Sequence, residues 1–216
     1  MDLLVDSFPD LLTGMMITLL LGVISFILGS ILGAAIMLAK ISGNRVLSAV
    51  ATAYVSVFRG TPLLIQIMII YFGLPQIGLE IPPIPSAIIA FTLFTAAYLS
   101  ENFRAGVLSV DKGQWEAAAS MAMPYWKTLR RVIFPQAIRI ALPPVGSRFI
   151  ALMKDTSLAS AVTVVELTRV AEGIGTSTFR YMDALLIVGL MYWLINTLLQ
   201  VGQQALERRM RKAYAT

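Results

Sequence analysis

Long stretches without a charged residue constrain this chain more than any other feature of its sequence. Residues 11–39 form a run of 29 uncharged residues, and residues 184–206 form a run of 23. Two further runs of 20 residues each cover residues 60–79 and 81–100. A helix needs roughly 20 apolar residues to cross the hydrocarbon core of a bilayer. The sequence therefore predicts an all-α integral membrane protein with several membrane-spanning helices.

Apolar stretches, charges and prolines together divide the chain into five expected transmembrane helices. We place these spans at about residues 11–39, 61–79, 86–108, 132–165 and 184–206. Four charged residues interrupt the fourth span, namely Arg139, Arg148, Lys154 and Asp155. Its Leu-Pro-Pro-Val-Gly stretch at 142–146 predicts a break or kink. The whole chain, 1–216, is then a single transmembrane domain.

The segment that leads into the second span is amphipathic. Residues 43–59 are expected to form an interfacial helix. Thr61 is a suitable N-cap for the next helix, and Pro62 suits the first helical position because its missing N–H is not needed there. We therefore expect the second span to begin at this Thr-Pro pair.

Lysine and arginine lie mostly on one side of the expected spans. With five spans and the N-terminus outside, the inner side receives Lys40, Arg45, Arg59, Lys112, Lys127, Arg130, Arg131, Arg208, Arg209, Arg211 and Lys212. The outer side receives only Arg169 and Arg180, and it holds the acidic residues Asp2, Asp6, Asp10, Glu80, Glu166, Glu172 and Asp183. Because cytoplasmic loops carry an excess of Lys and Arg, this bias predicts an outside N-terminus and a cytoplasmic C-terminus. The net charge of +5 is then a membrane-anchoring signal, and no nucleic-acid partner is expected.

A segment of small and charged residues, 111–131, separates the third and fourth spans on the cytoplasmic side. Asp111, with Gln114 three residues later, resembles a capping box and predicts a helix start. Pro124 interrupts the helical pattern that follows, so two short helices joined at residues 122–124 are expected.

The pattern of this segment leaves two interpretations open. Apolar residues recur at helical steps of three and four: Trp115, Ala119, Ala122, Trp126, Leu129 and Ile133. Such a face is typical of an interfacial helix that lies on lipid headgroups. The Glu-Ala-Ala-Ala-Ser stretch at 116–120 instead presents tiny side chains beside one carboxylate, which lets a partner protein approach closely.

The same segment resembles the signature loop of permease subunits of ABC importers. The family pattern is Glu-Ala-Ala followed at a distance by an aliphatic residue and a proline, and the matching residues are Glu116, Ala117, Ala118, Ile133 and Pro135. Ala122 stands where the family usually has glycine, which leaves the geometry of that turn open. In that family the loop is the coupling helix, which inserts into a groove of the cytoplasmic ATPase subunit. The ATPase-docking residues that the resemblance implies are Trp115, Glu116, Ala117, Ala118, Ala122, Pro124 and Arg130.

Three longer stretches are similar to permeases of polar amino-acid importers, nearest to the branch that handles cystine. They read YVSVFRGTPLLIQIMIIYFGLP, TAAYLSENFRAGVLSVDKGQWEAAA and LMKDTSLAS. The resemblance implies a type I ABC-importer permease fold in the bacterial cytoplasmic (inner) membrane. It also implies two ATP-binding cassette subunits below, an extracytoplasmic amino-acid-binding protein above, and a second permease subunit, with a homodimer favoured over a heterodimer. The outer loop VELTRVAEGIGTSTFRYMD is the expected docking face for the binding protein.

Charged residues inside membrane spans are costly, and each is therefore a functional hypothesis. Glu101 and Arg104 share one face of the third span, where they form either a structural ion pair or a site for a zwitterionic amino acid. Lys154 and Asp155 point in different directions on a regular helix, so they serve either the substrate path or packing between helices. The remaining candidates for substrate contact are Gln66, Tyr98, Thr156 and Ser157.

The absence of several sequence motifs argues against an enzyme. The chain has no His, no Cys and no G-x-x-x-x-G-K-[ST] phosphate loop, so no catalytic residue, metal ligand or cofactor is expected, and ATP hydrolysis belongs to a separate subunit. The alternative to an importer subunit is an ion-coupled secondary transporter or channel for a small polar solute. In that case Glu101 or Asp155 would be the coupling carboxylate.

Overall fold

Helices make up every regular element in the part of the chain that the computed structural model describes, residues 7–212, with side chains through Met210. The α-helices are α2 (Phe8–Ile41), α3 (Arg45–Gly60), α4 (Leu63–Met68), α5 (Pro83–Leu108), α6 (Lys112–Ser120), α7 (Tyr125–Thr128), α8 (Phe134–Asp155), α9 (Leu167–Thr178) and α10 (Tyr181–Lys212). Two π-helical turns, η1 (Ile69–Gly73) and η3 (Leu129–Ile133), and two 3-10 segments, η2 (Leu74–Ile77) and η4 (Thr156–Val162), connect them. Asp2, Asp6 and the side chains of Arg211 and Lys212, which entered the charge comparison above, lie outside the described residues.

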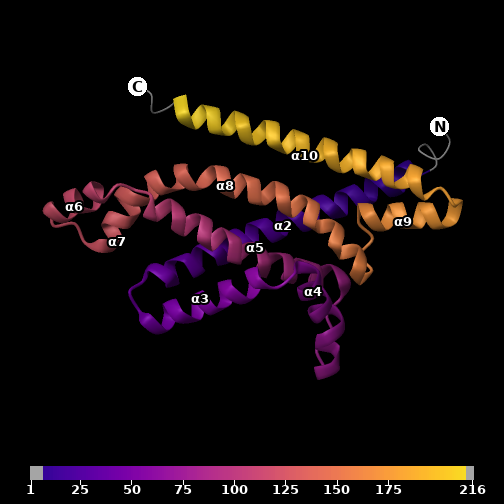
Figure 1. Cartoon of the computed structure of the whole chain (residues 1–216), viewed down its shortest axis with the longest axis horizontal. Coiled ribbons are helices and arrows are strands. Elements are labelled where there is room, and N and C mark those ends of the chain that lie inside the picture. The colour runs from indigo at the N-terminus through magenta and orange to yellow at the C-terminus, as the bar shows by residue number, and fades with distance from the viewer. Residues whose placement is uncertain (1–6, 213–216) are drawn as a thin grey trace.

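The long helices α2, α5 and α8 form the centre of the molecule, and α10 crosses its upper side in the view of Figure 1. The chain runs in one direction along α2, α5 and α10 and in the opposite direction along α3 and α8 (Figure 1). The α6–α7 segment projects from one end of this bundle, and α9 lies at the other end (Figure 1). The first turn of α2 and the last turn of α10 are therefore at opposite ends.

Small residues allow α2 and α5 to pack closely. A Cβ atom on Gly29 would meet the Thr95 side chain at 3.0 Å, and one on Gly33 would meet the Ala96 carbonyl oxygen at 3.0 Å. Small side chains are typical of helix contacts within membranes, where close packing replaces the hydrophobic effect. The main core joins α2, α4, α5 and α8 through residues such as Leu21, Ile67 and the fully buried Phe91.

Three helices in the described residues are long and apolar enough to cross a membrane: Phe8–Ile41, Pro83–Leu108 and Tyr181–Met210. They coincide with the first, third and fifth spans expected from the sequence. The helical segments Arg45–Gly60 and Leu63–Ile77 give a fourth span if this bent pair is counted as one span. α8 is long enough to cross a membrane but is not apolar enough, because the charges noted above interrupt its apolar sequence.

The chain bends by 104° between α3 and the helical run that starts at Leu63. α3 lies beside α2 and α5, and α4 with η1 runs in a different direction while still packing against α5 (Figure 1). The expectation of an interfacial helix over 43–59 is therefore wrong. One side of α3 packs on the bundle, where Ala51 and Val55 form a buried cluster with Ile36 and Ala96.

The expected helix start at the Thr-Pro pair is displaced by one residue. Pro62 is the N-cap and Leu63 is the first helical residue of α4. Thr61 is the C-cap of α3, and its hydroxyl donates to the carbonyl oxygen of Val57 at 2.9 Å. The pair therefore ends one helix as well as beginning the next.

α8 continues through Pro143 and Pro144 as one α-helix, so of the expected break or kink the break is absent, and the kink stays a prediction. The carbonyl oxygens of both prolines accept hydrogen bonds from other helices, from Gln203 on α10 at 3.0 Å and from Asn102 on α5 at 3.3 Å. The helix instead changes type directly after Asp155, where the 3-10 segment η4 begins. η4 ends at Val162, and Thr163 caps it with a left-handed φ of 65°.

The contact between α5 and α8 leaves no room for a side chain at Gly106. A Cβ atom there would lie 2.7 Å from the Ala137 carbonyl oxygen and 3.0 Å from the Ala141 Cβ. We expect Gly106→Leu to destabilise the protein by about 1–3 kcal/mol, because overpacking forces the backbones apart. Thermal unfolding of the detergent-solubilised protein measures this loss of stability. Gly189→Leu on α10 is the control, since nothing lies within 4 Å of its Cβ position, and equal stability of both variants would contradict the packing argument.

Candidate functional site

A charged and aromatic cluster lies where α5, α8 and the end of α3 meet. Arg148 and Asp155 stand two helical turns apart on α8, and Arg148 Nη2 donates to Asp155 Oδ2 at 2.8 Å. The Arg148 side chain is 11% exposed and that of Asp155 is 30% exposed. The pair is thus partly buried, with the carboxylate the more accessible partner.

The Arg148 guanidinium also lies over two aromatic rings on α5. Its Cζ lies 4.9 Å from the centroid of Phe94 and 5.0 Å from that of Tyr98. Arg59, at the end of α3, also lies over the Tyr98 ring at 5.0 Å. Cations over aromatic faces are attracted by the ring quadrupole. The cluster therefore carries two guanidinium groups against one carboxylate, Asp155.

Free hydrogen-bonding capacity remains in this cluster, which we call the Arg148 cluster (Arg59, Phe94, Tyr98, Arg148 and Asp155). The Arg148 Nε atom is buried and has no hydrogen-bond partner within the described residues. A guanidinium binds a carboxylate through a fork of two parallel donors, and a carboxylate accepts from an ammonium group. The cluster therefore offers both charges that an α-amino acid requires.

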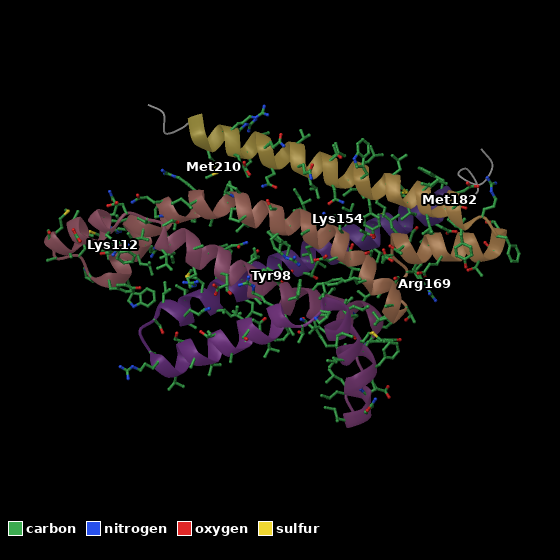
Figure 2. The ribbon with its side chains drawn as sticks, in the orientation of Figure 1. Tyr98, Lys112, Lys154, Arg169, Met182 and Met210 are labelled. Carbon is green, nitrogen blue, oxygen red and sulfur yellow. The ribbon has the colours of Figure 1, made fainter. Side chains whose placement is uncertain are left out.

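The four predicted residues at 154–157 separate in space. Asp155 joins the Arg148 cluster, whereas Lys154 is exposed near the end of α8 (Figure 2). The Thr156 hydroxyl is fully buried and donates to the Met153 carbonyl oxygen at 2.7 Å. The Ser157 hydroxyl donates to the Lys154 carbonyl oxygen at 2.8 Å. Both hydroxyls therefore serve as donors to carbonyl oxygens in the last turn of α8.

Glu101 and Arg104 belong to a second charged group, nearer the α6–α7 end of the bundle. Arg104 donates to Glu101 Oε2 from Nη2 at 2.9 Å and from Nε at 3.2 Å. Lys40 on α2 donates to the other oxygen, Oε1, at 2.5 Å. Both oxygens of Glu101 therefore have a cationic partner, and the group ties the last turn of α2 to α5.

Gln66 lies at the bend between α3 and α4, next to the end of α3 that carries Arg59. Its Nε2 atom donates to the carbonyl oxygens of Phe58 and Thr61, at 3.0 and 3.1 Å, and to the Thr61 hydroxyl at 2.8 Å. The 104° bend ends α3 and leaves its last carbonyl oxygens without partners inside a helix. The bonds from Gln66 supply these partners. The buried Oε1 has no partner within the described residues.

The α6–α7 segment has the two short helices expected from its sequence. The Asp111 side chain caps α6 by accepting from the Gly113 N–H at 2.7 Å. Gln114 does not complete a capping box, because its oxygen accepts from Gln136 at 3.2 Å. Trp115 on α6 stacks on Tyr125 on α7 with ring centroids 5.8 Å apart, which fixes the two helices relative to each other.

Ala122 makes the turn between these helices in a left-handed conformation, with φ of 55°. The Met123 N–H donates to the Ala118 carbonyl oxygen at 3.1 Å, and the Ala122 N–H donates to that of Ala119 at 2.9 Å. This is the Schellman pattern, in which glycine usually occupies the left-handed position. The turn therefore has the geometry that a glycine would give, despite the alanine side chain.

Most of this segment faces outward, although the single apolar face expected from its spacing does not form. Ala118, Leu129 and Ile133 are buried, and Leu129 and Ile133 pack against the ends of α2 and α5. The exposed residues include Glu116, Ala117, Ala119, Met121, Ala122, Pro124, Trp126 and Arg130. α6 thus presents a small-residue surface beside the Glu116 carboxylate, held out from the bundle (Figures 1 and 2).

We expect Ala122→Gly to stabilise the α6–α7 segment, because a left-handed conformation costs an L-residue about 1–2 kcal/mol. Part of this gain is offset by the greater conformational entropy of glycine in the unfolded chain. Hydrogen exchange of the α6 amides measures the change. Ala119→Gly, inside α6, should have the opposite sign, with a cost of about 1 kcal/mol. Faster exchange in Ala122→Gly would contradict this account of the turn.

A buried carboxylate organises the opposite end of the molecule. Glu166 is fully buried and caps α9 by accepting from the N–H groups of Thr168 and Arg169 at 2.8 and 2.9 Å. Its Oε2 also accepts from the Tyr192 hydroxyl on α10 at 2.8 Å. Burial raises the pKa of the Glu166 carboxyl above its ordinary value, and the backbone bonds act against this rise. Glu166 thereby fixes α9 against α10.

Arg59, Phe94, Arg148 and Lys40 are site residues that were not predicted from the sequence. Arg148 was noted only as an interruption of the fourth span, yet it stands seven residues before Asp155, on the same helix face. The seven-residue spacing between Arg148 and Asp155 was the signal from which their pairing could have been predicted. The aromatic partner Phe94 and the cation Lys40 come from other helices, and no local pattern in the sequence indicates them.

The chain matches a protein family and several curated relatives. A family model described as "Binding-protein-dependent transport system inner membrane component" matches residues 31–212. The L-cystine transport system permease protein TcyB of Bacillus subtilis is 46% identical, over 99% of this chain and 92% of the relative. The probable amino-acid ABC transporter permease protein YckA of the same organism is 42% identical, over 96% of this chain and 92% of the relative.

Solved structures show the same architecture. A crystal structure of an amino acid ABC transporter with histidines contains a chain that is 36% identical, with a TM-score of 0.92. The match covers 95% of this chain and 96% of that one. An inward-facing MetNI methionine ABC transporter, at 22% identity and a TM-score of 0.72, shares the fold.

Proposed function

Since this chain belongs to the family of inner membrane components of binding-protein-dependent transport systems, we propose that it moves a polar amino acid across the bacterial cytoplasmic membrane by alternating access. As a permease of an ABC importer it is a non-catalytic subunit, and ATP is hydrolysed by partner subunits. The observation that carries the proposal is the outward-facing, small-residue α6 at one end of the bundle. Such a surface fits a groove in an ATPase, whereas an ion-coupled carrier has no use for it.

We propose five membrane spans with the N-terminus outside and the C-terminus in the cytoplasm. Besides the three long apolar helices, the second span is the bent run from α3 to η2 and the fourth is α8 with η4. The alternating directions of these helices and the Lys and Arg excess at the α6–α7 end support this topology. α6 and α7 then lie in the cytoplasm as the coupling loop.

We propose that the Arg148 cluster binds the substrate. Arg148 and Arg59 attract the α-carboxylate, Asp155 accepts from the α-ammonium group, and Tyr98 lies beneath both guanidinium groups. Glu101 and Arg104 serve instead as a structural group, because Lys40 and Arg104 already occupy both carboxylate oxygens. Gln66, Thr156 and Ser157 shape the two helix ends that border the path.

The substrate class follows from the relatives and from this charge arrangement. The 46% identity to a cystine permease supports cystine or a related amino acid as the cargo. Cystine carries two ammonium and two carboxylate groups, and a cluster with two guanidinium groups and one carboxylate can pair with more than one of these.

The partners we propose complete a transporter with two halves. Two copies of this chain form the transmembrane part, two ATP-binding cassette subunits receive the coupling loops, and an extracytoplasmic binding protein docks at α9. ATP-driven closure of the ATPase subunits moves both coupling loops as rigid bodies and rocks the helices between inward-facing and outward-facing states. The stacked Trp115 and Tyr125 and the Asp111 cap give the loop the rigidity that this requires.

Co-purification tests this assignment. The chain co-expressed with its ATPase subunit is expected to be isolated as a stable complex from detergent-solubilised membranes. Deleting residues 116–121 should abolish the complex while the permease still reaches the membrane. Undiminished co-purification of the deletion variant would argue against α6 as the docking element.

A further inference from the structure

An apolar crevice with a volume of about 200 Å³ opens between α2, α5 and α8, away from the Arg148 cluster. Its walls are formed only by apolar side chains, among them Ala34, Met37, Phe103, Phe134 and Ile138. This volume is smaller than the roughly 300–1,000 Å³ of sites that take a whole drug-sized ligand, so the crevice fits a narrow apolar group. Ile138 is 58% exposed, so the crevice reaches the outer surface of the bundle.

The crevice lies next to the α6–α7 end of the membrane helices. Met37 stands one helical turn before Lys40 near the end of α2, and Phe134 stands one turn after Arg130 and Arg131. An apolar crevice at this depth is surrounded by the acyl chains of one leaflet, and its end toward α6 meets the headgroups.

Positive charge gathers at the headgroup end of the crevice. Lys40 and Arg104 share the single carboxylate of Glu101, so that group keeps one net positive charge. Arg130 and Arg131 are exposed and form no ion pair within the described residues. Basic pockets between membrane helices at this depth bind anionic headgroups.

We propose that the crevice is a binding site for an anionic phospholipid. One acyl chain fills the space between Ala34, Phe103 and Ile138, and the headgroup phosphate lies against Arg131 and its neighbours. The charge arrangement favours a lipid over a helix from a second copy of the chain, since the apolar walls end in uncompensated cations. A bound lipid would brace α2, α5 and α8 at the base of the coupling loop.

Native mass spectrometry of the permease–ATPase complex, titrated with phosphatidylglycerol or with phosphatidylcholine of the same chain length, tests this site. The wild-type complex should retain phosphatidylglycerol more tightly than phosphatidylcholine. Ala34→Phe fills the crevice and should weaken phosphatidylglycerol binding by about tenfold or more. Ala35→Phe, on the exposed neighbouring position, is the matched control and should bind the lipid as the wild type does.

A second pair of variants tests the contribution of the positive charges to headgroup binding. Arg131→Gln should reduce the preference for phosphatidylglycerol over phosphatidylcholine, whereas Arg45→Gln, exposed at the start of α3, should leave it unchanged. If Ala34→Phe misfolds, Ile138→Gln at the mouth of the crevice replaces it, with Ile140→Gln as control. Equal lipid binding by the crevice variants and their controls would overturn the proposal. So would a loss of the second permease copy in Ala34→Phe, because a helix would then occupy the crevice.

Discussion

Substituting lysine for Arg148 is expected to lower amino-acid uptake by at least about tenfold without preventing assembly of the transporter. Lysine keeps the positive charge opposite Asp155, but it loses the planar fork of donors and the contact with Phe94 and Tyr98. A lysine ammonium group has no pair of parallel donors with which to bind a substrate carboxylate while it keeps its bond to Asp155. Uptake of a labelled amino acid into proteoliposomes that contain the complete complex measures the effect.

Arg180→Lys is the matched control for this variant. Arg180 also pairs with an aspartate, Asp183, at 2.6 Å, but on the exposed outer end of the molecule. It should transport as the wild type does. If Arg104→Lys impairs uptake severely and Arg148→Lys does not, the substrate site lies instead at the group around Glu101.

Introducing tryptophan at Ala119 is expected to uncouple ATP hydrolysis from transport and to reduce uptake by at least about tenfold. Ala119 is exposed on α6, so the larger side chain leaves the fold of the permease intact. It would occupy space that the ATPase groove needs for close approach to the small residues around Glu116. Uptake and the amount of co-purified ATPase should fall together.

Ala205→Trp provides the comparison for this substitution. Ala205 is also an exposed alanine, on the part of α10 near the same end of the bundle. It lies outside the coupling loop, so uptake and co-purification should be unchanged. Equal behaviour of the two tryptophan variants would mean that α6 does not enter the ATPase.

The sequence was informative where a local signal decides the structure. Runs without charge identify α2, α5 and α10, because the bilayer excludes charged side chains over the length of a span. The Asp111 cap and Pro124 act within a few residues, so the two short helices of the coupling loop were predictable. The family assignment, which rested on this loop and on three longer stretches, is confirmed by the family model and the relatives.

Arrangements that depend on distant residues were less predictable. The amphipathic pattern of α3 fits a membrane surface as well as a bundle, and only contact with Ile36 and Ala96 decides between them. The same holds for Glu101, whose pairing with Lys40 joins residues 61 positions apart. Arg148 shows an intermediate case, because its spacing to Asp155 is visible in the sequence but its aromatic partners are not.

The energy source of transport tests the central claim most directly. Proteoliposomes containing this chain, its ATPase subunits and the binding protein should accumulate a labelled amino acid only when ATP is present on the side of the coupling loop. The same chain without ATPase subunits should give no uptake under any sodium or proton gradient. Uptake by the chain alone, driven by an ion gradient, would contradict its assignment as the permease of an ATP-driven importer.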